Sequence, residues 1–153
     1  MEDFAAQFED ILSLGQLENE FDVPGREKTH RVRVGVLWNS DVIRIKDRAA
    51  RRVTIGDSAT RREIEIIETL VEAILSIDNV DFFDPKNLSN HDALKSNLRV
   101  ILDKASPYVV TYIYGKYLET VNTASQEVNR RVEEIKKSSG LPLKETPQQV
   151  ELS

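Results

Sequence analysis

Residues 60–77 read TRREIEIIETLVEAILSI, a stretch that is apolar around more of a helical circumference than any other window of the chain. On a helix of about 3.6 residues per turn, its apolar side chains cover more than half of the circle. Thr60 and Glu63 have the spacing of a capping box, which marks a helix start. We therefore predict a central helix over residues 60–77 that is buried on two sides. Its narrow solvated strip should hold three glutamates: Glu65, Glu68 and Glu72.

The length and composition predict one soluble domain. A chain of 153 residues can bury about two-thirds of its unfolded surface without disulfides or metals. It contains no cysteine, which excludes disulfides, thiolate catalysis and cysteine-ligated metal sites. The first ten residues, MEDFAAQFED, carry four acids and no base, the reverse of a signal or transit sequence. No apolar run approaches the ~20 residues of a membrane span, so we expect no membrane contact.

Charge is arranged in blocks along the chain. Residues 1–25 hold seven acids and no base, residues 26–62 hold eleven bases and four acids, and residues 63–153 hold ten bases and fifteen acids. The basic block binds nucleic acid or an acidic protein, or it is neutralised by the chain's own acidic N-terminal arm. We favour the internal or protein-bound alternative.

Residues 1–26 are expected to form an acidic N-terminal arm. Residues 3–14 have the pattern of a short amphipathic helix with four apolar residues on one face: Phe4, Phe8, Ile11 and Leu12. Residues 15–26 are polar, contain a Pro-Gly pair and read as a connection. A helix this short is not stable alone, so the arm must dock on its own domain or on another chain.

A strand is expected from residue 28, where apolar and mostly basic side chains alternate up to Trp38. The next segment, residues 41–52, fits two patterns. It is a second strand after a tight turn, or a helix capped by Asn39 or Ser40. We prefer the helix, because apolar residues recur at intervals of three and four: Val42, Ile45 and Ala49.

Two further elements should follow the central helix. Residues 78–90 read as a loop from which three apolar side chains close over the core: Val80, Phe82 and Phe83. A third helix, capped by Ser89 or Asn90, should run to Ala105. Its apolar stripe consists of Leu94, Leu98, Ile101, Leu102 and Ala105.

The last helix is expected to be the longest. Ser106 and Pro107 suit the N-cap and the first helical position, and the helix can continue to about residue 138. Residues 107–118 contain all four tyrosines of the chain, which make a core contact with the preceding helix or a partner-binding cluster. Beyond them only one stripe remains, at heptad-like spacing: Val121, Ala124, Val128, Val132 and Ile135.

These elements predict a mainly α protein with a small β element, in the α+β class. It should be a helical bundle around a central buried helix, with a long C-terminal helix. The acidic arm covers residues 1–26, and a single globular helical domain covers residues 27–138. Residues 139–153, which are polar and contain two prolines, should form a disordered tail.

No motif for catalysis or cofactor binding is present in the sequence. It contains no glycine-rich dinucleotide loop, Walker A loop, H-E-x-x-H motif or EF-hand spacing. The only two histidines are His30 and His91, to which we assign structural or exposed roles. We therefore expect a non-enzymatic protein that needs no cofactor and no metal.

Nucleic-acid binding is the alternative from another class. Arginines in the block 44–62 can bind phosphates, but Trp38 is the only aromatic stacking group near them, and the pI of the chain is about 5.2. We therefore do not expect nucleic acid to be the principal partner. Instead, Arg48, Arg51 and Arg52 should steer a protein partner into register.

Several segments together resemble a known family over residues 28–121. They are VGVLWNSDVIRIKDRAARR, the later motif E-x-L-V-x-A-I-x-S-I-D, and S-P-x-V-V-x-x-x-Y-x-x-Y. In this order they resemble small proteins of tailed bacteriophages that assist tail or baseplate-hub assembly. Such proteins are cytosolic and non-enzymatic, and they bind other tail components through helices and flexible ends. This chain lacks the C-terminal cysteine pairs that some of these proteins carry.

The resemblance implies a chaperone or a structural component in phage tail or baseplate assembly. The protein would be located in the host cytoplasm or, as a component, in the virion tail. Its partners would be other tail or baseplate proteins, with a homo-oligomer through the C-terminal helix as a further arrangement. We expect three segments to supply the contacts: Phe4, Phe8, Ile11, Arg48, Arg51, Arg52, Val121, Val128, Val132 and Ile135.

Overall fold

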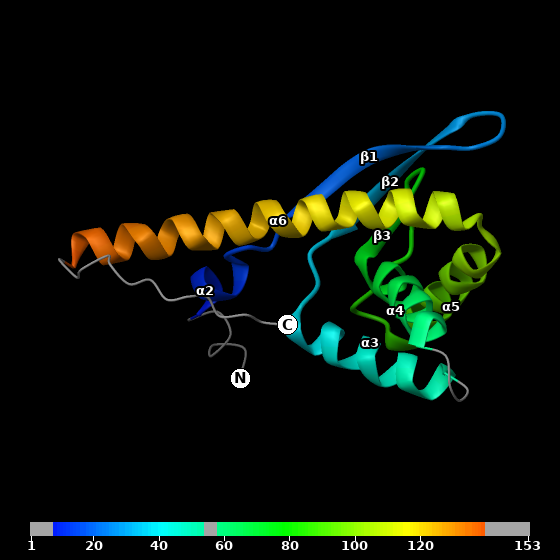
Figure 1. Cartoon of the computed structure of the whole chain (residues 1–153), viewed down its shortest axis with the longest axis horizontal. Helices are drawn as coiled ribbons and strands as arrows, with labels where there is room; N and C mark the ends of the chain where they lie inside the picture. The colour runs from blue at the N-terminus through cyan, green and yellow to red at the C-terminus, as the bar shows by residue number, and fades with distance from the viewer. Residues whose placement is uncertain (1–7, 54–57, 140–153) are drawn as a thin grey trace. The chain divides into compact units, whose positions relative to one another are not determined.

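The structure is a computed structural model that describes residues 8–53 and 58–139, without the side chains of residues 58–60. Within these ranges the chain is mainly helical and carries one small antiparallel sheet (Figure 1), which confirms the predicted fold class. Its elements in chain order are α2 (Glu9–Ser13), β1 (Glu18–Pro24), β2 (Thr29–Gly35), α3 (Asn39–Arg52), α4 (Ser58–Ala73), β3 (Ile74–Ile77), β4 (Val80–Asp81), α5 (Leu88–Lys104) and α6 (Pro107–Ser138).

Contacts divide the chain into two compact units. The first unit combines the described parts of Met1–Gly15 and Asn122–Ser153, so it holds α2 and the end of α6. The second unit, Gln16–Val121, holds the sheet, α3, α4, α5 and the first turns of α6. The helix α6 therefore contributes to both units.

The sheet has the order β1-β2-β3-β4, and each neighbouring pair is antiparallel. Its first strand, β1, shows that the connection expected over residues 15–26 is wrong. Apolar and polar side chains alternate along this strand, which places Phe21 and Val23 in the core. Opposite Phe21 in the register lies Val32 of β2, which is also buried. The alternation of apolar and polar side chains along β2 was predicted from the sequence.

The central apolar stretch is helical only as far as Ala73. The helix α4 begins earlier than expected, at Ser58, and the Thr60 side chain of the predicted capping box lies outside the described residues. The last four residues of the stretch form β3, which pairs with β2. β-Branched side chains favour a strand, and here Ile74 points into the core while Ile77 is only partly buried.

A tight turn follows β3. Asp78 and Asn79 have φ values of 51° and 67°, the conformation of a two-residue hairpin turn. The Asp78 carboxylate accepts a hydrogen bond from Arg31 N–H at 2.8 Å and lies 2.6 Å from His30 Nδ1. These contacts lower the pKa of Asp78. The turn leads directly into β4, so the continuous loop expected over residues 78–90 is wrong.

Residues 41–52 are helical, which confirms the preferred alternative. Trp38 takes the N-cap position of α3, one residue before Asn39 and two before Ser40, so the predicted caps are wrong. The Asp41 carboxylate accepts a hydrogen bond from the Trp38 backbone N–H at 3.1 Å, and this bond closes the first turn. The buried side chains of α3 are Ile45 and Ala49.

The third predicted helix is α5, and its start is set by Asn87. The Asn87 side chain accepts a hydrogen bond from Asn90 N–H at 3.2 Å. Asn87 is therefore the N-cap, and the predicted cap at Ser89 or Asn90 is wrong.

A hydrophobic core holds the second unit together. It takes side chains from the strands β1, β2 and β3, from the helices α4 and α5 and from the first turns of α6. Its fully buried members include Val34, Leu70, Val71, Ile74 and Leu98. Phe82 is buried as expected. Ile101, Val80 and Phe83 are exposed, so their predicted place in the core is wrong.

The helix α6 runs without interruption over Pro107–Ser138, as predicted. The Ser106 hydroxyl accepts a hydrogen bond from Tyr108 N–H at 3.1 Å, which is the predicted N-cap. Val110 and Ile113 enter the core of the second unit. The first turns of α6 therefore pack as expected.

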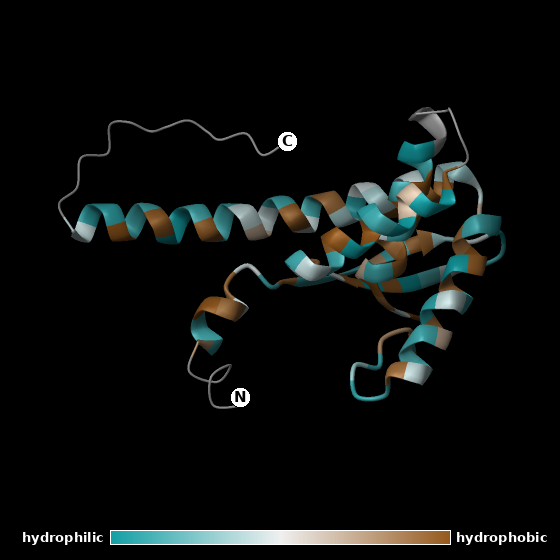
Figure 2. Cartoon of the chain, turned by 90° about the horizontal axis from the view of Figure 1, so that it is seen from below, coloured by the Kyte–Doolittle hydropathy of each residue, from teal (hydrophilic) through white to brown (hydrophobic). Residues whose placement is uncertain are grey.

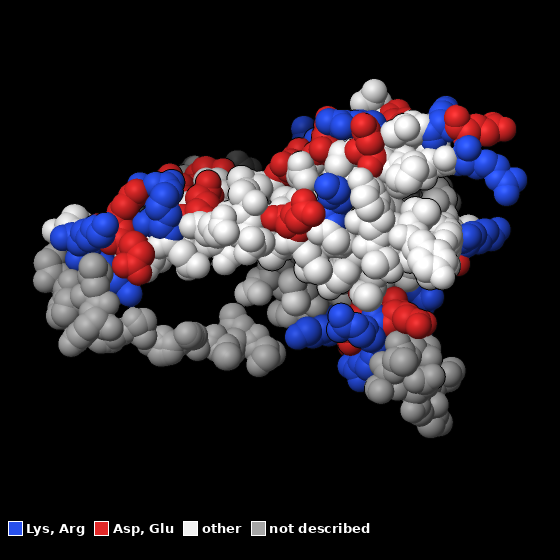
Figure 3. Space-filling view, turned by 45° about the horizontal axis from the view of Figure 1, so that its top comes forward, with Lys and Arg blue, Asp and Glu red and all other residues white. Residues whose placement is uncertain are grey.

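The four tyrosines of α6 do not form one cluster. Tyr117 is buried, and burial raises its pKa to about 12. Tyr112 contacts β1, where its hydroxyl donates to the Asp22 carbonyl at 3.0 Å and its ring meets Phe21 edge-on. Tyr108 is 86% exposed, and Figure 3 shows uncharged surface over the first turns of α6. The observed contact of Tyr112 is thus with the sheet, whereas the prediction placed the tyrosines against the preceding helix.

Candidate protein-binding surfaces

The first unit exposes large apolar side chains on α2 and on the last turns of α6. Ile11 is 69% exposed and Ile135 is 64% exposed. Figure 2 shows the apolar segments of both helices in brown. We name this set the terminal apolar surface, and its members are Phe8, Ile11, Leu12, Leu14, Val132 and Ile135.

Only the end of the predicted α6 stripe belongs to this surface. Ala124 is buried and Val128 is half-buried. Gly15 lies beside them, and its N–H donates to Glu127 Oε1 at 2.9 Å. A Cβ at Gly15 would lie 3.1 Å from Val128 Cγ2, and the φ of +83° also requires glycine. The chain after α2 is thus anchored on α6, and the last turns of α6 stay exposed.

Of two other residues expected at a partner contact, one lies elsewhere and one is not described. Val121 packs against the core of the second unit. Phe4 lies outside the described residues. The exposed contact residues from the two apolar segments are therefore Phe8, Ile11, Val132 and Ile135.

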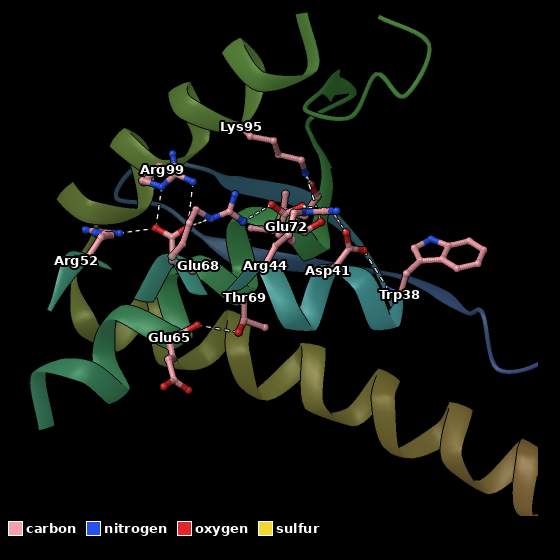
Figure 4. Close-up of polar contacts among 12 residues, drawn as sticks. Trp38, Asp41, Arg44, Arg52, Glu65, Glu68, Thr69, Glu72, Lys95 and Arg99 are labelled. Carbon is pink, nitrogen blue, oxygen red and sulfur yellow. Dashed lines mark hydrogen bonds and ion pairs between the residues drawn. The ribbon is translucent and has the colours of Figure 1, made fainter. Parts of the chain in front are cut away.

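A buried ion cluster joins α3, α4 and α5 (Figure 4). Its centre is the fully buried Glu68. Arg99 donates two hydrogen bonds to this carboxylate, from Nε at 2.8 Å and from Nη2 at 2.9 Å. Arg48 Nε lies 3.1 Å from Oε1, and Arg52 donates to Oε2. A second buried carboxylate, Glu72, pairs with Arg48, and Arg52 also lies 3.5 Å from the carboxylate of Asp103, so three acids of the unit face the three guanidinium groups.

The cluster corrects the prediction of a solvated glutamate strip on α4. Glu68 and Glu72 are buried beneath α3 and α5, and Glu65 remains partly exposed. Burial alone would raise the pKa of Glu68, but hydrogen bonds from Arg99 and Arg52 outweigh burial and lower it. The carboxylate is therefore ionised near neutral pH.

Much of the basic block is neutralised inside the chain. Arg48 and Arg52 are held by the glutamates of α4, whereas Arg51 pairs with Asp47 on the exposed side of α3. The arginines of β2 pair with acids of β1, namely Arg33 with Glu18 and Arg31 with Asp22. Of the three arginines expected at a partner contact, Arg51 is the one with a largely exposed side chain.

This cluster was missed in the sequence, although the sequence carries a signal for it. Two arginines stand four residues apart on one helix, Arg48 and Arg52, and two glutamates stand four residues apart on the next, Glu68 and Glu72. Residues four apart share one helical face, so two such pairs can meet when the helices pack. No comparable signal identifies Arg99 as the third arginine.

Lys95 of α5 is a buried cation at the end of α4. Its Nζ donates to the carbonyl oxygen of Ile74 at 2.9 Å and to that of Glu72 at 3.4 Å. A helix leaves its last carbonyls without intrahelical partners, and this ammonium group satisfies them where α4 passes into β3. Burial lowers the pKa of Lys95 to about 8.

Stability should depend on pH through Lys95. An unfolded lysine has a pKa of about 10.4, so the unfolded chain binds this proton more tightly than the folded chain does. The free energy of unfolding should therefore rise by roughly 2 kcal/mol between about pH 7.5 and pH 10. Urea titrations of wild type and Lys95→Met measure this rise, which the variant should lack. Lys104→Met, at an exposed position of α5, should keep it; an equal rise in Lys95→Met would contradict the prediction.

The two histidines have structural contacts. His30 lies against Asp78 in the hairpin turn, and His91 Nδ1 accepts a hydrogen bond from Asp84 N–H at 2.9 Å. Across residues 8–53 and 58–139, no group of three or more histidine or acidic side chains is placed to hold a metal ion. In the same part of the chain, no helix combines the length and the apolar character needed to cross a bilayer.

The whole chain has no recognisable relative among the known proteins compared with it. No protein-family model matches it, and neither the curated proteins nor the solved structures give a significant match.

Proposed function

We propose that this chain binds partner proteins, without catalysis, through the terminal apolar surface. The exposure of Ile11 on α2 and Ile135 on α6 is the observation that carries the proposal. Burial of one such side chain by a partner contributes roughly 1.5–3 kcal/mol. Large apolar side chains gathered on one small unit are typical of interaction sites.

The proposed setting is the assembly of a phage tail or baseplate. The protein would act there as a chaperone or a structural component, in the host cytoplasm or in the virion tail. The resemblance over residues 28–121 supports this setting, whereas the division of the chain supports a contact through the first unit. The second unit has its own core and ion cluster, which leaves the first unit to make the contacts.

Pairing of α6 with a second copy in a coiled coil has less support. Coiled coils need an apolar seam sustained over several heptads. On α6 the seam is buried at Ala124 and half-buried at Val128, so Val132 and Ile135 are the exposed positions that remain. A surface that combines the end of α6 with α2 fits a partner protein better.

Nucleic-acid binding also has less support than protein binding. Phosphate contacts need accessible cations, and Arg48 and Arg52 are held by buried Glu68. The arginine block thus contributes to the fold of the second unit.

The proposal is tested by partner capture followed by reconstitution. A tagged chain is purified from bacteria that express the neighbouring genes, the co-purifying protein is identified, and its affinity for the purified chain is measured. Ile11→Asp and Ile135→Asp should each weaken this affinity at least about tenfold, because each loses more than about 1.4 kcal/mol of apolar burial.

Ile43 of α3 provides the matched control, since it is 66% exposed but lies in the second unit. Ile43→Asp introduces the same chemical change and should leave the affinity within about twofold. Equal binding by wild type, Ile11→Asp and Ile135→Asp would rule out the terminal apolar surface as the contact. A co-purifying protein that is a tail or hub component would support the phage setting.

A further inference from the structure

The second unit carries a pocket of about 640 Å³ between the start of α3, the segment after β4 and the first turns of α5. Its lining includes aromatic, apolar and cationic side chains: Trp38, Phe83, Leu88, Arg44, Lys95 and Arg99. This pocket is separate from the terminal apolar surface, because all of its lining residues lie in Gln16–Val121.

Exposed aromatic side chains form part of the pocket wall. Trp38 and Phe83 are each about half exposed, and the Trp38 indole points away from the ion cluster (Figure 4). Phe83 meets the His91 ring edge-on, with centroids 5.4 Å apart. Tryptophan and arginine dominate the energetics of many protein interfaces, so Trp38 near Arg44 suits a contact with a protein segment.

The lining of this pocket carries four basic and three acidic side chains. The Arg44 side chain is 54% exposed, whereas the carboxylates that it pairs with, Asp41 and Glu72, are 15% and 8% exposed. Asp92 is an exposed acid of the lining. Arg44 is therefore the most exposed cation of the lining, and it is more exposed than the two carboxylates that it pairs with, so its guanidinium group can bind an acid of a ligand.

We propose that residues 1–7 of a second copy of this chain dock in this pocket. The segment reads MEDFAAQ, with two acids directly before a phenylalanine and no base. Phe4 would be the apolar anchor beside Trp38 and Phe83, because aromatic pairs contribute beyond the area that they bury. The adjacent acids of the segment, Glu2 and Asp3, would pair with Arg44 in charge-assisted hydrogen bonds.

The proposed contact is self-complementary. Each copy contributes one acidic segment and one pocket, so two copies can exchange segments and form a closed dimer. The two contacts then act together and raise the effective concentration of each segment. The contact does not depend on the proposed function, because it uses neither α2 nor the end of α6.

Sedimentation velocity of the full-length chain tests the proposal. Wild type should dimerise reversibly at low salt, and high salt should weaken the association. Trp38→Ala and Arg44→Glu should each weaken it at least tenfold, with unchanged circular dichroism. Ile135→Asp should dimerise like wild type, which separates this dimer from an association through α6.

A charge swap gives the decisive arm of the experiment. Arg44→Glu alone and the double variant E2K/D3K alone should both stay monomeric. Their equimolar mixture should form a heterodimer, because the lysine-bearing segment meets the glutamate pocket and the acidic segment meets the native pocket.

Three results would overturn the proposal: a wild type that stays monomeric up to about 1 mM, variants that dimerise like wild type, or a mixture that stays monomeric. Binding of the synthetic peptide MEDFAAQ to a wild-type chain that stays monomeric would show that the pocket takes this segment without forming a dimer, which would also overturn the proposal.

Discussion

Glu68→Gln should lower the free energy of unfolding by about 3–5 kcal/mol, the usual cost of breaking a buried ion pair by removing one partner. The substitution keeps the side-chain shape but leaves the guanidinium groups of Arg48, Arg52 and Arg99 without the carboxylate that they surround. Urea denaturation near pH 7 measures this loss. Because a small domain has only about 5–15 kcal/mol of stability, the variant should be close to unfolding at 37 °C.

Glu65 of the same helix is the matched control for this substitution. Its side chain is 37% exposed and pairs with Arg61 on the surface. Exposed pairs of this kind contribute about 0–1 kcal/mol, so Glu65→Gln should have a small effect. Equal losses in Glu65→Gln and Glu68→Gln would show that the buried cluster does not hold α3, α4 and α5 together.

The contribution of Glu68 should also disappear in acid. Its pKa in the folded chain is lowered, so its stabilising effect is complete above the unfolded glutamate pKa of about 4.3. The effect is lost as the pH falls through the lower pKa of the folded state. The difference in stability between wild type and Glu68→Gln should therefore narrow below about pH 4.

Leu70→Ala should cost about 2–5 kcal/mol of unfolding free energy. Leu70 is fully buried in α4, and its removal leaves a cavity in the core that the sheet, α5 and α6 share. Thermal denaturation followed by circular dichroism measures the loss.

Ile101→Ala in α5 is the control for the core substitution. Ile101 is about half exposed, although its place in the helical stripe predicted burial. Its removal should cost clearly less than the removal of Leu70. Equal costs would show that α4 is not the centre of the core.

The helices could be predicted where one periodicity dominates a long segment. Ser106 and Pro107 mark the start of α6, and its apolar stripe continues for many turns. The four residues of β3 could not be assigned in the same way, because Ile74–Ile77 continues an apolar run that also fits a helix. Their strand conformation depends on pairing with β2, a contact between segments far apart in the chain.

The strand β1 was missed for a similar reason. It has only two core residues, Phe21 and Val23, among acidic neighbours. Those acids fit a strand because they pair with arginines of the neighbouring strand β2. Cross-strand pairs of opposite charge stabilise a sheet, but the sequence does not show which arginines will lie opposite.

The exposed apolar residues at the two ends of the chain were easier to identify than the ion cluster. Ile11 and Ile135 follow from helical periodicity within single segments. The burial of Glu68 depends on three helices packing together, and its charge suggested solvent exposure. Local patterns therefore located a candidate binding surface, whereas the buried polar contacts required the tertiary structure.

Hydrogen–deuterium exchange of the full-length chain, alone and in complex with its co-purified partner, tests most directly whether the terminal apolar surface is the binding site. We expect the partner to slow exchange in α2 and in the last turns of α6, because a covered helix opens less often. Slower exchange confined to Gln16–Val121, with α2 and the end of α6 unchanged, would contradict the proposed function.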